Sequence, residues 1–383
     1  MLVKAPAPTD FTSRLRGPEV TARVGLWLGI CFLTAFVTGL VSHFAQDTPG
    51  WLTFPTRPVS LYRVTQGLHL ISGTAAVPLL LVKLWSVFPK LFERLHVRKP
   101  RTLALEVAER GSIALLVSAA IFQLATGLAN SSQWYPWSFS FRDTHYAVAW
   151  IAIGALLLHI AVKLPLIRSA LTGPLDDDPA ATSSAGGLSR RGLLRTTWLA
   201  AGVAVLGTAG ATVPVLRSIS VFGVRSGDGP QGIPINKSAK AAGVIAAATS
   251  SSYALRLVNG DTTTSVTTAD LESMPQTTAD LPIACVEGWS ASGTWTGVRV
   301  SELLAYMDAP VGASLEIESL QKSGAFRVTQ LPGHFASDPL TLLALKLDGE
   351  TLSIDHGYPC RIIAPNRPGV LQTKWVTRMT VLS

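Results

Sequence analysis

Five long stretches without a charged side chain constrain this chain more than any other feature of its sequence. They cover residues 24–46, 64–82, 111–141, 144–162 and 196–216. A helix that crosses a bilayer needs about 20 predominantly apolar residues, and each stretch reaches or nearly reaches that length. The sequence therefore predicts five membrane-spanning helices, followed by a separate aqueous domain after residue 220.

The net charge of +8 belongs to the predicted membrane half. Residues 1–219 carry 20 Lys and Arg against 10 Asp and Glu, a balance of +10, whereas residues 220–383 carry 12 against 14, a balance of −2. No nucleic-acid partner is therefore needed to explain the basic composition. Basic residues precede the first span and gather between the second and third, which predicts that these segments are cytoplasmic. They are Arg14, Arg16, Arg23, Lys90, Arg94, Arg98, Lys99 and Arg101.

With a cytoplasmic N-terminus, the fifth span places the last domain outside a bacterial cell membrane. Residues 171–195 are predicted to be a cytoplasmic linker that ends in the string SRRGLLR. Arg190 and Arg191 resemble a twin-arginine export signal, here internal, which would export a domain already folded around a cofactor. The alternative is a pair of positive-inside arginines beside an ordinary helix. Both interpretations put the domain outside, and we expect the fifth helix to remain uncleaved.

Four of the seven histidines lie within or beside the uncharged stretches, where ionisable side chains are costly and therefore functional candidates. His145 and His159 are 14 residues apart, so their rings leave the same helix face about 21 Å apart. This spacing suits two stacked haems b, each held by two imidazoles. From their depth, we predict that outer His43 pairs with His145 and inner His69 with His159. The alternative for each is a hydrogen-bonded interfacial side chain.

The histidine pattern over residues 20–170 resembles the four-helix di-haem cytochrome b subunits of formate dehydrogenases and nickel-iron hydrogenases. The resemblance rests on one histidine in the first span, one in the second, and two spaced by 14 in the fourth. It implies that the chain lies in membrane lipid and exchanges electrons with the quinone pool. It identifies no residues of a quinone pocket.

Short alternating runs replace the apolar stretches after residue 250. They are YALRLV, LEIESL, FRVTQL, TLSI, CRIIAP and WVTRMTVL. Alternation with a period of two, interrupted by Gly, Pro and Asp, predicts a β-rich α+β domain. The expected fold is an all-α bundle of four transmembrane helices plus a fifth anchoring helix, followed by this domain. The predicted divisions are a cytochrome b-like membrane domain (1–170), a cytoplasmic linker (171–195), a fifth transmembrane helix (196–218), an extracytoplasmic linker (219–249) and the β-rich domain (250–383).

The β-rich region carries none of the common catalytic signatures: its sequence has no phosphate-binding glycine loop, no HExxH and no paired-cysteine motif. Two strings stand out, IACVEGWSASGTWTGVRVSELL and HGYPCRIIAPNRPGVLQTKWVTRMTVL, with DPLTLLAL between them. In this order they resemble the molybdopterin-binding domain of the sulfite oxidase family over residues 250–383. The resemblance implies a sulfite oxidase-type fold and a molybdenum-molybdopterin cofactor.

The string CVEGWS is more similar to the periplasmic protein-methionine-sulfoxide reductase branch of that family than to the sulfite oxidases. The latter place arginines just after the cysteine to hold a sulfur oxyanion, whereas Val286, Glu287 and Gly288 supply none. A small dianionic substrate is therefore disfavoured. The reductase branch works with a separate six-span haem protein, whereas here a different cytochrome is fused to the domain.

The resemblance makes Cys285 the thiolate ligand of molybdenum, a soft donor that the metal keeps deprotonated. Glu287 would accept protons or order water beside the metal, with a surface glutamate as the alternative. Trp289 would pack against the pterin or within the core. Cys360 is expected to be a packing residue, and with Cys31 inside a span the chain allows at most one extracytoplasmic disulfide.

The terminal phosphate of the cofactor requires cations, which the closing segment supplies by resemblance. Lys374 is the first candidate. Arg361 and Arg367 are further candidates, or solvated strand and loop charges. His356 would hydrogen-bond the cofactor or remain a turn histidine.

These assignments predict a membrane-bound molybdenum oxidoreductase that transfers an oxygen atom in a two-electron reaction on the extracytoplasmic side. Electrons would pass between molybdenum and quinone through haem b. Reduction of an S-oxide or N-oxide, on a small molecule or a protein, is favoured. The alternatives are a dehydrogenase of sulfite or another sulfur compound that feeds quinone, and a relay cytochrome with a catalytically empty outer domain.

Overall fold

The computed structural model describes residues 7, 10, 11, 13–93, 100–175, 188–223 and 229–382. The predictions for Arg94, Arg98, Lys99 and most of the cytoplasmic linker fall outside these residues. The chain forms two compact units that do not follow its linear order. The helical unit contains residues 1–39, 68–209 and 218–223, and the β-rich unit contains residues 40–67, 210–217 and 224–383.

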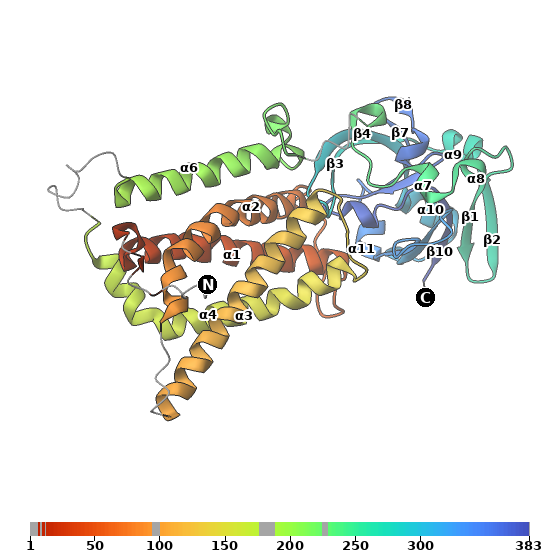
Figure 1. Cartoon of the computed structure of the whole chain (residues 1–383). Helices are drawn as coiled ribbons and strands as arrows, with labels where there is room; N and C mark the ends of the chain where they lie inside the picture. Colours follow the sequence, from red (N-terminus) through yellow and green to blue (C-terminus); the bar gives the residue numbers. More distant parts are fainter. Residues whose placement is uncertain are drawn as a thin grey trace. The chain divides into compact units, whose positions relative to one another are not determined.

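Five helices among the described residues are long and apolar enough to cross a bilayer. They are α1 (Pro18–Gln46), α2 (Leu61–Val87), α3 (Pro100–Ser131), α4 (Phe141–Thr172) and α6 (Arg190–Thr208) (Figure 1). The uncharged stretch 111–141 is therefore not one helix. It ends in a loop that contains Pro136, and proline disfavours a helical residue before it.

Polar contacts hold the ends of the helical unit together. The Arg23 guanidinium of α1 donates to the carbonyls of Ala170, Leu171 and Gly173 at 3.0–3.1 Å. These bonds satisfy carbonyl groups that the C-terminus of α4 leaves without helical partners. Apolar side chains stay exposed along all five helices, as a lipid-facing surface requires.

The β-rich unit contains two five-stranded sheets (Figure 1). The first has the order β2-β1-β10-β5-β6, in which only β1 and β10 pair in parallel. The second has the order β3-β4-β7-β8, with β9 paired to β7, and is antiparallel throughout. The described fold therefore matches the predicted helical region followed by a β-rich α+β domain.

The elements of this unit are short. The strands are β1 (Ala254–Asn259), β2 (Thr262–Thr267), β3 (Thr277–Ala284), β4 (Ser290–Arg299), β5 (Leu315–Ser319), β6 (Val328–Leu331), β7 (Leu342–Leu347), β8 (Glu350–Thr351), β9 (Arg361–Ile363) and β10 (Val376–Val381). The helices are α7 (Ala239–Ala242), α8 (Ile245–Ala248), α9 (Thr268–Ser273), α10 (Val300–Tyr306) and α11 (Gly333–Ala336).

Four of the six predicted alternating runs overlap a strand over most of their length, and CRIIAP overlaps β9 over half of its length. The run TLSI does not, because only Thr351 belongs to β8. The Ser353 side chain accepts a hydrogen bond from the Asp355 N–H, which starts a 3₁₀ turn at Ile354. A serine that caps a turn competes with the strand conformation.

Residues 40–67 belong to the β-rich unit, although the sequence predicted them to be the end of the first span, the loop after it and the start of the second span. Phe54 and Tyr62 are buried in the larger hydrophobic core of the unit, with residues from several strands. The Arg57 guanidinium forms an ion pair with Asp338 at 2.9 Å. Asn366 holds the segment from the other side, donating to the Pro55 carbonyl and accepting from the Tyr62 N–H, both at 2.6 Å.

Residues 229–249, predicted to be part of an extracytoplasmic linker, also pack into the β-rich unit. Ile233 is buried in the second hydrophobic core. His356 donates to the Pro230 carbonyl at 2.5 Å, and Asp355 accepts from the Ala239 N–H at 2.7 Å. The sequence did not predict this structure, because α7 and α8 are too short to show a periodic pattern.

Candidate functional sites

The loop between β3 and β4 presents Cys285. The Cys285 N–H donates to the Trp289 carbonyl at 2.9 Å, and the Gly288 N–H returns to the Cys285 carbonyl at 3.0 Å. Gly288 adopts a φ of +93°, which a residue with a Cβ rarely adopts. The tight loop turns the Cys285 side chain inward, where only 1% of the residue is exposed.

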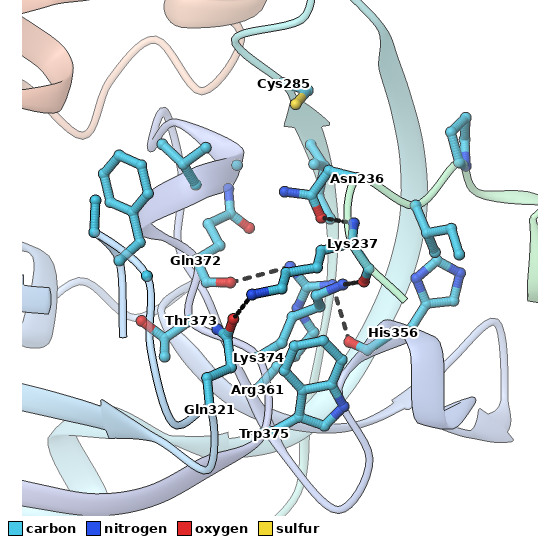
Figure 2. A pocket seen from close by; sticks show the side chains of 18 of the residues that line it. Asn236, Lys237, Cys285, Gln321, His356, Arg361, Gln372, Thr373, Lys374 and Trp375 are labelled. Atoms are coloured by element: carbon cyan, nitrogen blue, oxygen red, sulfur yellow. Dashed lines mark hydrogen bonds between the residues drawn. The ribbon is translucent and has the colours of Figure 1, made fainter. Parts of the chain in front are cut away.

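Cys285 lines a cavity in the β-rich unit, and Figure 2 shows its sulfur at the edge of a group of polar side chains. Five residues predicted from the sequence meet in this cavity: Cys285, Trp289, His356, Arg361 and Lys374. They come from the β3–β4 loop, the turn before β9, β9 itself and the segment before β10. The fold therefore gathers side chains that are up to 89 positions apart in the sequence.

Burial is the main influence on the Cys285 thiol and raises its pKa well above the usual value. The Glu287 carboxylate raises this pKa further, whereas the backbone N–H groups of Glu287 and Val286 lower it. A bare thiolate is therefore unfavourable here. A bound metal ion would supply the positive charge that a thiolate needs at this position.

Three cationic side chains line the cavity: Lys237, Arg361 and Lys374. The Lys374 ammonium donates to the carbonyls of Lys237 at 2.6 Å and Asp355 at 2.9 Å. Burial, followed by the charge of Arg361, lowers the pKa of Lys374 to about 7. Burial also lowers the pKa of Arg361 to about 9, and this guanidinium lies over the face of Trp295.

His356 is a neutral donor in this wall of the cavity. Burial and the neighbouring Arg361 charge lower its pKa to about 4. Its Nε2 lies 2.5 Å from the Pro230 carbonyl oxygen, which can only accept, so Nε2 carries the proton. The His356 carbonyl in turn accepts from the Arg361 guanidinium at 3.0 Å.

Two predicted site residues do not line the cavity. Arg367 is a buried brace whose guanidinium donates to the carbonyls of Leu371 and Gln330 and lies over the Phe335 ring. The prediction that it binds the cofactor phosphate is therefore not supported by its position. Glu287 lies beside the cavity, and its carboxylate accepts from the Trp289 indole at 3.2 Å.

Other cavity residues escaped the sequence analysis. Asn236 and Lys237 come from the segment predicted to be a linker, and the Lys237 ammonium donates to the Gln321 side chain at 2.8 Å. Gln372 lies in the closing segment of the domain. The string IPINK of residues 233–237, an apolar start followed by Asn and Lys, is the one local signal that could have marked this segment. Cys360 is buried in the larger core, and all three cysteines are free.

A second candidate site lies in the helical unit, between α2 and α4. The ring centroids of His69 and His145 are 6.3 Å apart. Two metal–nitrogen bonds of about 2 Å, with the short distance from each nitrogen to its ring centre, span close to this separation. The structure thus brings His69 to His145, and the predicted pairing of His69 with His159 is wrong.

The observed helix bounds explain this correction. His69 is eight residues after the start of α2, and His145 is four residues after the start of α4, a difference of about 6 Å in rise. His159 is 18 residues after the start of α4. His43, the predicted partner of His145, belongs to the β-rich unit and has the Phe44 ring as a neighbour.

Hydrogen bonds fix the orientation of both rings. The His69 Nδ1 donates to the Ala35 carbonyl at 2.8 Å, so its Nε2 carries no proton. The His145 Nδ1 lies 3.1 Å from the Thr126 hydroxyl, whose own proton goes to the Phe122 carbonyl. Both Nε2 atoms are thereby left as acceptors, the state that binds a metal ion.

A family model described as the oxidoreductase molybdopterin binding domain matches residues 242–383. These residues form a molybdopterin-binding oxidoreductase domain. The prediction drawn from the motifs around Cys285 and His356 is thereby confirmed, and it makes this domain an enzyme domain that uses a molybdenum cofactor.

Three relatives show the breadth of the likeness. A protein of Azospira oryzae, named as a subunit of protein-methionine-sulfoxide reductase, is 32% identical over 113 residues, which cover 29% of this chain and 42% of that protein. The protein-methionine-sulfoxide reductase catalytic subunit of Gluconobacter oxydans is 31% identical over 26% of this chain and 36% of its own. Mitochondrial sulfite oxidase of Mus musculus is 29% identical over a region that covers 25% of this chain and 19% of that protein. This chain thus spans less than half the length of each relative.

The cavity of the molybdopterin-binding domain fits such a cofactor. The Nε of Arg361 and the Oε1 of Gln372 are buried without a hydrogen-bond partner among the described residues. An unsatisfied buried polar atom is costly, and a pterin with its phosphate offers both donors and acceptors to such atoms. Lys374 and Arg361 supply positive charge for the phosphate, and Cys285 supplies a thiol for the metal.

Proposed function

We propose that the chain is a membrane-bound molybdenum oxidoreductase that transfers an oxygen atom in a two-electron reaction, with electrons exchanged through haem b and the quinone pool. The observation that carries the proposal is the position of Cys285, which lies at the edge of a cavity lined by three cations. The likeness to relatives named for methionine sulfoxide and sulfite supports the same reaction class.

The chain's residues divide the work of holding the cofactor. Lys374 and Arg361 would bind the phosphate, and the Arg361 Nε and Gln372 Oε1 would pair with polar atoms of the cofactor. Cys285 would bind molybdenum through its sulfur, and the N–H groups of the β3–β4 loop would stabilise the thiolate. When bound, the cofactor supplies the two-electron oxygen-atom transfer itself.

Reduction of an S-oxide or N-oxide is the favoured direction. The Glu287 carboxylate lies beside Cys285 and raises the pKa of its thiol, so it adds negative charge close to the metal ligand. A doubly negative substrate such as sulfite would be repelled there, whereas a neutral oxide would not. The Glu287 carboxylate is also placed to hold a proton for the oxygen atom that leaves as water.

A haem b between His69 and His145 would connect the reaction to the membrane. Both rings point an unprotonated Nε2 away from their Nδ1 hydrogen bonds, and their spacing suits one iron held by two imidazoles. A Cβ at position 39 would lie 3.2 Å from the His69 ring, so the glycine at this position leaves room for the ring. We propose a cytoplasmic N-terminus and an extracytoplasmic enzyme domain on the positive-inside argument.

Haem absorbance in isolated membranes tests the function directly. Methionine sulfoxide or trimethylamine N-oxide should oxidise the reduced haem, and sulfite should leave the oxidised haem unchanged. Cys285→Ser should abolish this oxidation, and the matched control Cys31→Ser, in α1, should not. Haem that is reduced by sulfite and ignores every oxide would replace the proposal with a sulfur-compound dehydrogenase.

The haem assignment has its own test. His69→Leu and His145→Leu should each remove the same haem from the purified protein, measured as its pyridine haemochrome. His159→Leu is the matched control on α4 and should retain that haem. Loss of haem in His159→Leu together with full haem in His69→Leu would overturn the assignment.

A further inference from the structure

The Cys285 loop is held by two residues from outside the matched domain. The Gln66 side chain, in α2, donates through Nε2 to the Val286 carbonyl at 3.3 Å. The Thr212 hydroxyl, after α6, donates to the Gly288 carbonyl. The Thr212 carbonyl accepts from the Ser290 hydroxyl at 2.9 Å, so Thr212 holds the loop and the first residue of β4.

The two holding residues are themselves buried. Gln66 is 7% exposed and Thr212 is 5% exposed. A Cβ at position 67 would lie 2.9 Å from the Thr212 methyl group, so Gly67 allows α2 and the Thr212 segment to meet at the loop. The Gln66 Oε1 is buried without a hydrogen-bond partner among the described residues. A buried acceptor without a partner costs free energy, and the hydrogen bond that Gln66 donates to the loop offsets part of that cost.

The Gln66 contact reaches the thiol through one peptide group. The peptide between residues 286 and 287 accepts from Gln66 at its carbonyl, and its N–H, that of Glu287, is one of the two backbone groups that lower the pKa of the Cys285 thiol. Hydrogen bonds in series polarise one another, so a donor on the carbonyl makes the N–H a stronger donor to sulfur. The thiolate then gives less electron density to a bound metal ion.

We propose that Gln66 and Thr212 are positioning residues for the molybdenum ligand: Gln66 tunes the Cys285 thiolate through the 286–287 peptide, and Thr212 fixes the loop that carries it. The inference rests on the proposed function, because it takes Cys285 as the ligand. It adds that two residues near the ends of predicted transmembrane spans, outside residues 242–383, set the properties of the metal site.

The full-length, molybdenum-loaded protein in detergent provides the test. Gln66→Met keeps the side-chain volume and removes the donor, and Thr65→Val is its control, since the Thr65 hydroxyl bonds only carbonyls of its own helix among the described residues. Gln66→Met should keep the molybdenum content, change the Mo(V) electron paramagnetic resonance signal and lower the molybdenum midpoint potential. The loss of one hydrogen bond should lower kcat by about twofold to tenfold with little change in KM.

The Thr212 hydroxyl is tested by a matched pair of variants. Thr212→Val removes the donor, and Thr212→Ser retains it. The Val variant should show an altered Mo(V) signal or lose molybdenum, and the Ser variant should resemble the wild type. Gly67→Ala should disturb the same signal, whereas Gly73→Ala in the same helix, where a Cβ meets nothing within 4 Å, should not.

Three results would overturn the inference. They are a Gln66→Met signal and potential equal to those of Thr65→Val, identical behaviour of Thr212→Val and Thr212→Ser, and equal effects of Gly67→Ala and Gly73→Ala. A wild-type protein without molybdenum, or a Cys285→Ser variant with the wild-type Mo(V) signal, would instead refute the proposed function. The two failures are therefore distinguishable.

Discussion

Asn366 provides a direct test of whether residues 40–67 are part of the β-rich unit. Its side chain is 2% exposed and forms two hydrogen bonds of 2.6 Å, to the Pro55 carbonyl and from the Tyr62 N–H. Tyr62 is in the first turn of α2, whose N–H groups have no partner within the helix. Asn366 thus caps this helix from more than 300 positions away.

The cost of Asn366→Ala follows from these contacts. The substitution leaves the buried Tyr62 N–H unpaired, at about 1–3 kcal/mol, and removes the hydrogen bond to the part-buried Pro55 carbonyl, at about 0.5–1.5 kcal/mol. Asn366 also has a φ of +54°, where alanine is less favourable than asparagine by about 1 kcal/mol. We therefore expect a loss of about 2.5–5.5 kcal/mol in the free energy of unfolding. For a unit of this size, the melting temperature should fall by about 5–22 °C.

Thermal unfolding of the purified full-length protein, followed by tryptophan fluorescence, measures this effect. Trp295 and Trp375 are fully buried in the β-rich unit and report its unfolding. Asn366→Asp keeps the acceptor for Tyr62 and loses the donor to Pro55, so it should cost less. Asn259→Ala is the control, because Asn259 bonds loop carbonyls within the matched domain. An Asn366→Ala melting temperature within about 2 °C of that control would refute the reasoning.

Three further predictions concern the enzyme domain. Cys285→Ser should abolish oxygen-atom transfer and leave the haem absorbance spectrum intact, and turnover by a molybdenum-loaded Ser variant would contradict the ligand assignment. In the folded protein without cofactor, the pKa of Lys374 is about 7, against an ordinary value of 10.5. Between these pH values the unfolded state binds more protons than the folded state, so the free energy of unfolding rises with pH. Lys374→Met should remove this rise in pH-dependent melting, and an unchanged profile would argue against the buried ammonium. Replacing Arg190 and Arg191 with Lys should keep the domain from the outer face in a protease-accessibility assay, and a molybdenum-loaded domain that still reaches it would rule out the twin-arginine signal.

The sequence predicted those parts of the fold that depend on local patterns. Five uncharged stretches marked five helices, because a bilayer-length apolar run is a local property. Alternating runs marked β1, β5, β6, β9 and β10 for the same reason. Residues 40–67 and 229–249 were misplaced, since their structure depends on partners such as Asn366 and Asp355 that are more than 100 positions away.

The residues of the candidate site likewise fall into those that local sequence predicted and those that it did not. Cys285, His356 and Lys374 were found because each stands in a string of residues that resembles a known family. Lys237 and Gln66 were missed because only the folded chain brings them to the cavity and its loop. The predicted pairing of His69 with His159 was wrong for a geometric reason: His69 and His145 lie eight and four residues after the starts of α2 and α4, whereas His159 lies 18 residues after the start of α4.

The buried cations give the domain a reason to hold its cofactor tightly. Burial lowers the pKa of both Arg361 and Lys374, and the charge of Arg361 lowers the pKa of Lys374 further. The carbonyls that they contact offset only part of this cost, since a carbonyl is a dipole and not a counter-charge. A phosphate in the cavity would supply the missing negative charge and restore the ordinary pKa of both groups. Cofactor binding and folding of the β-rich unit should therefore be coupled, because a ligand that binds only the folded state raises its stability.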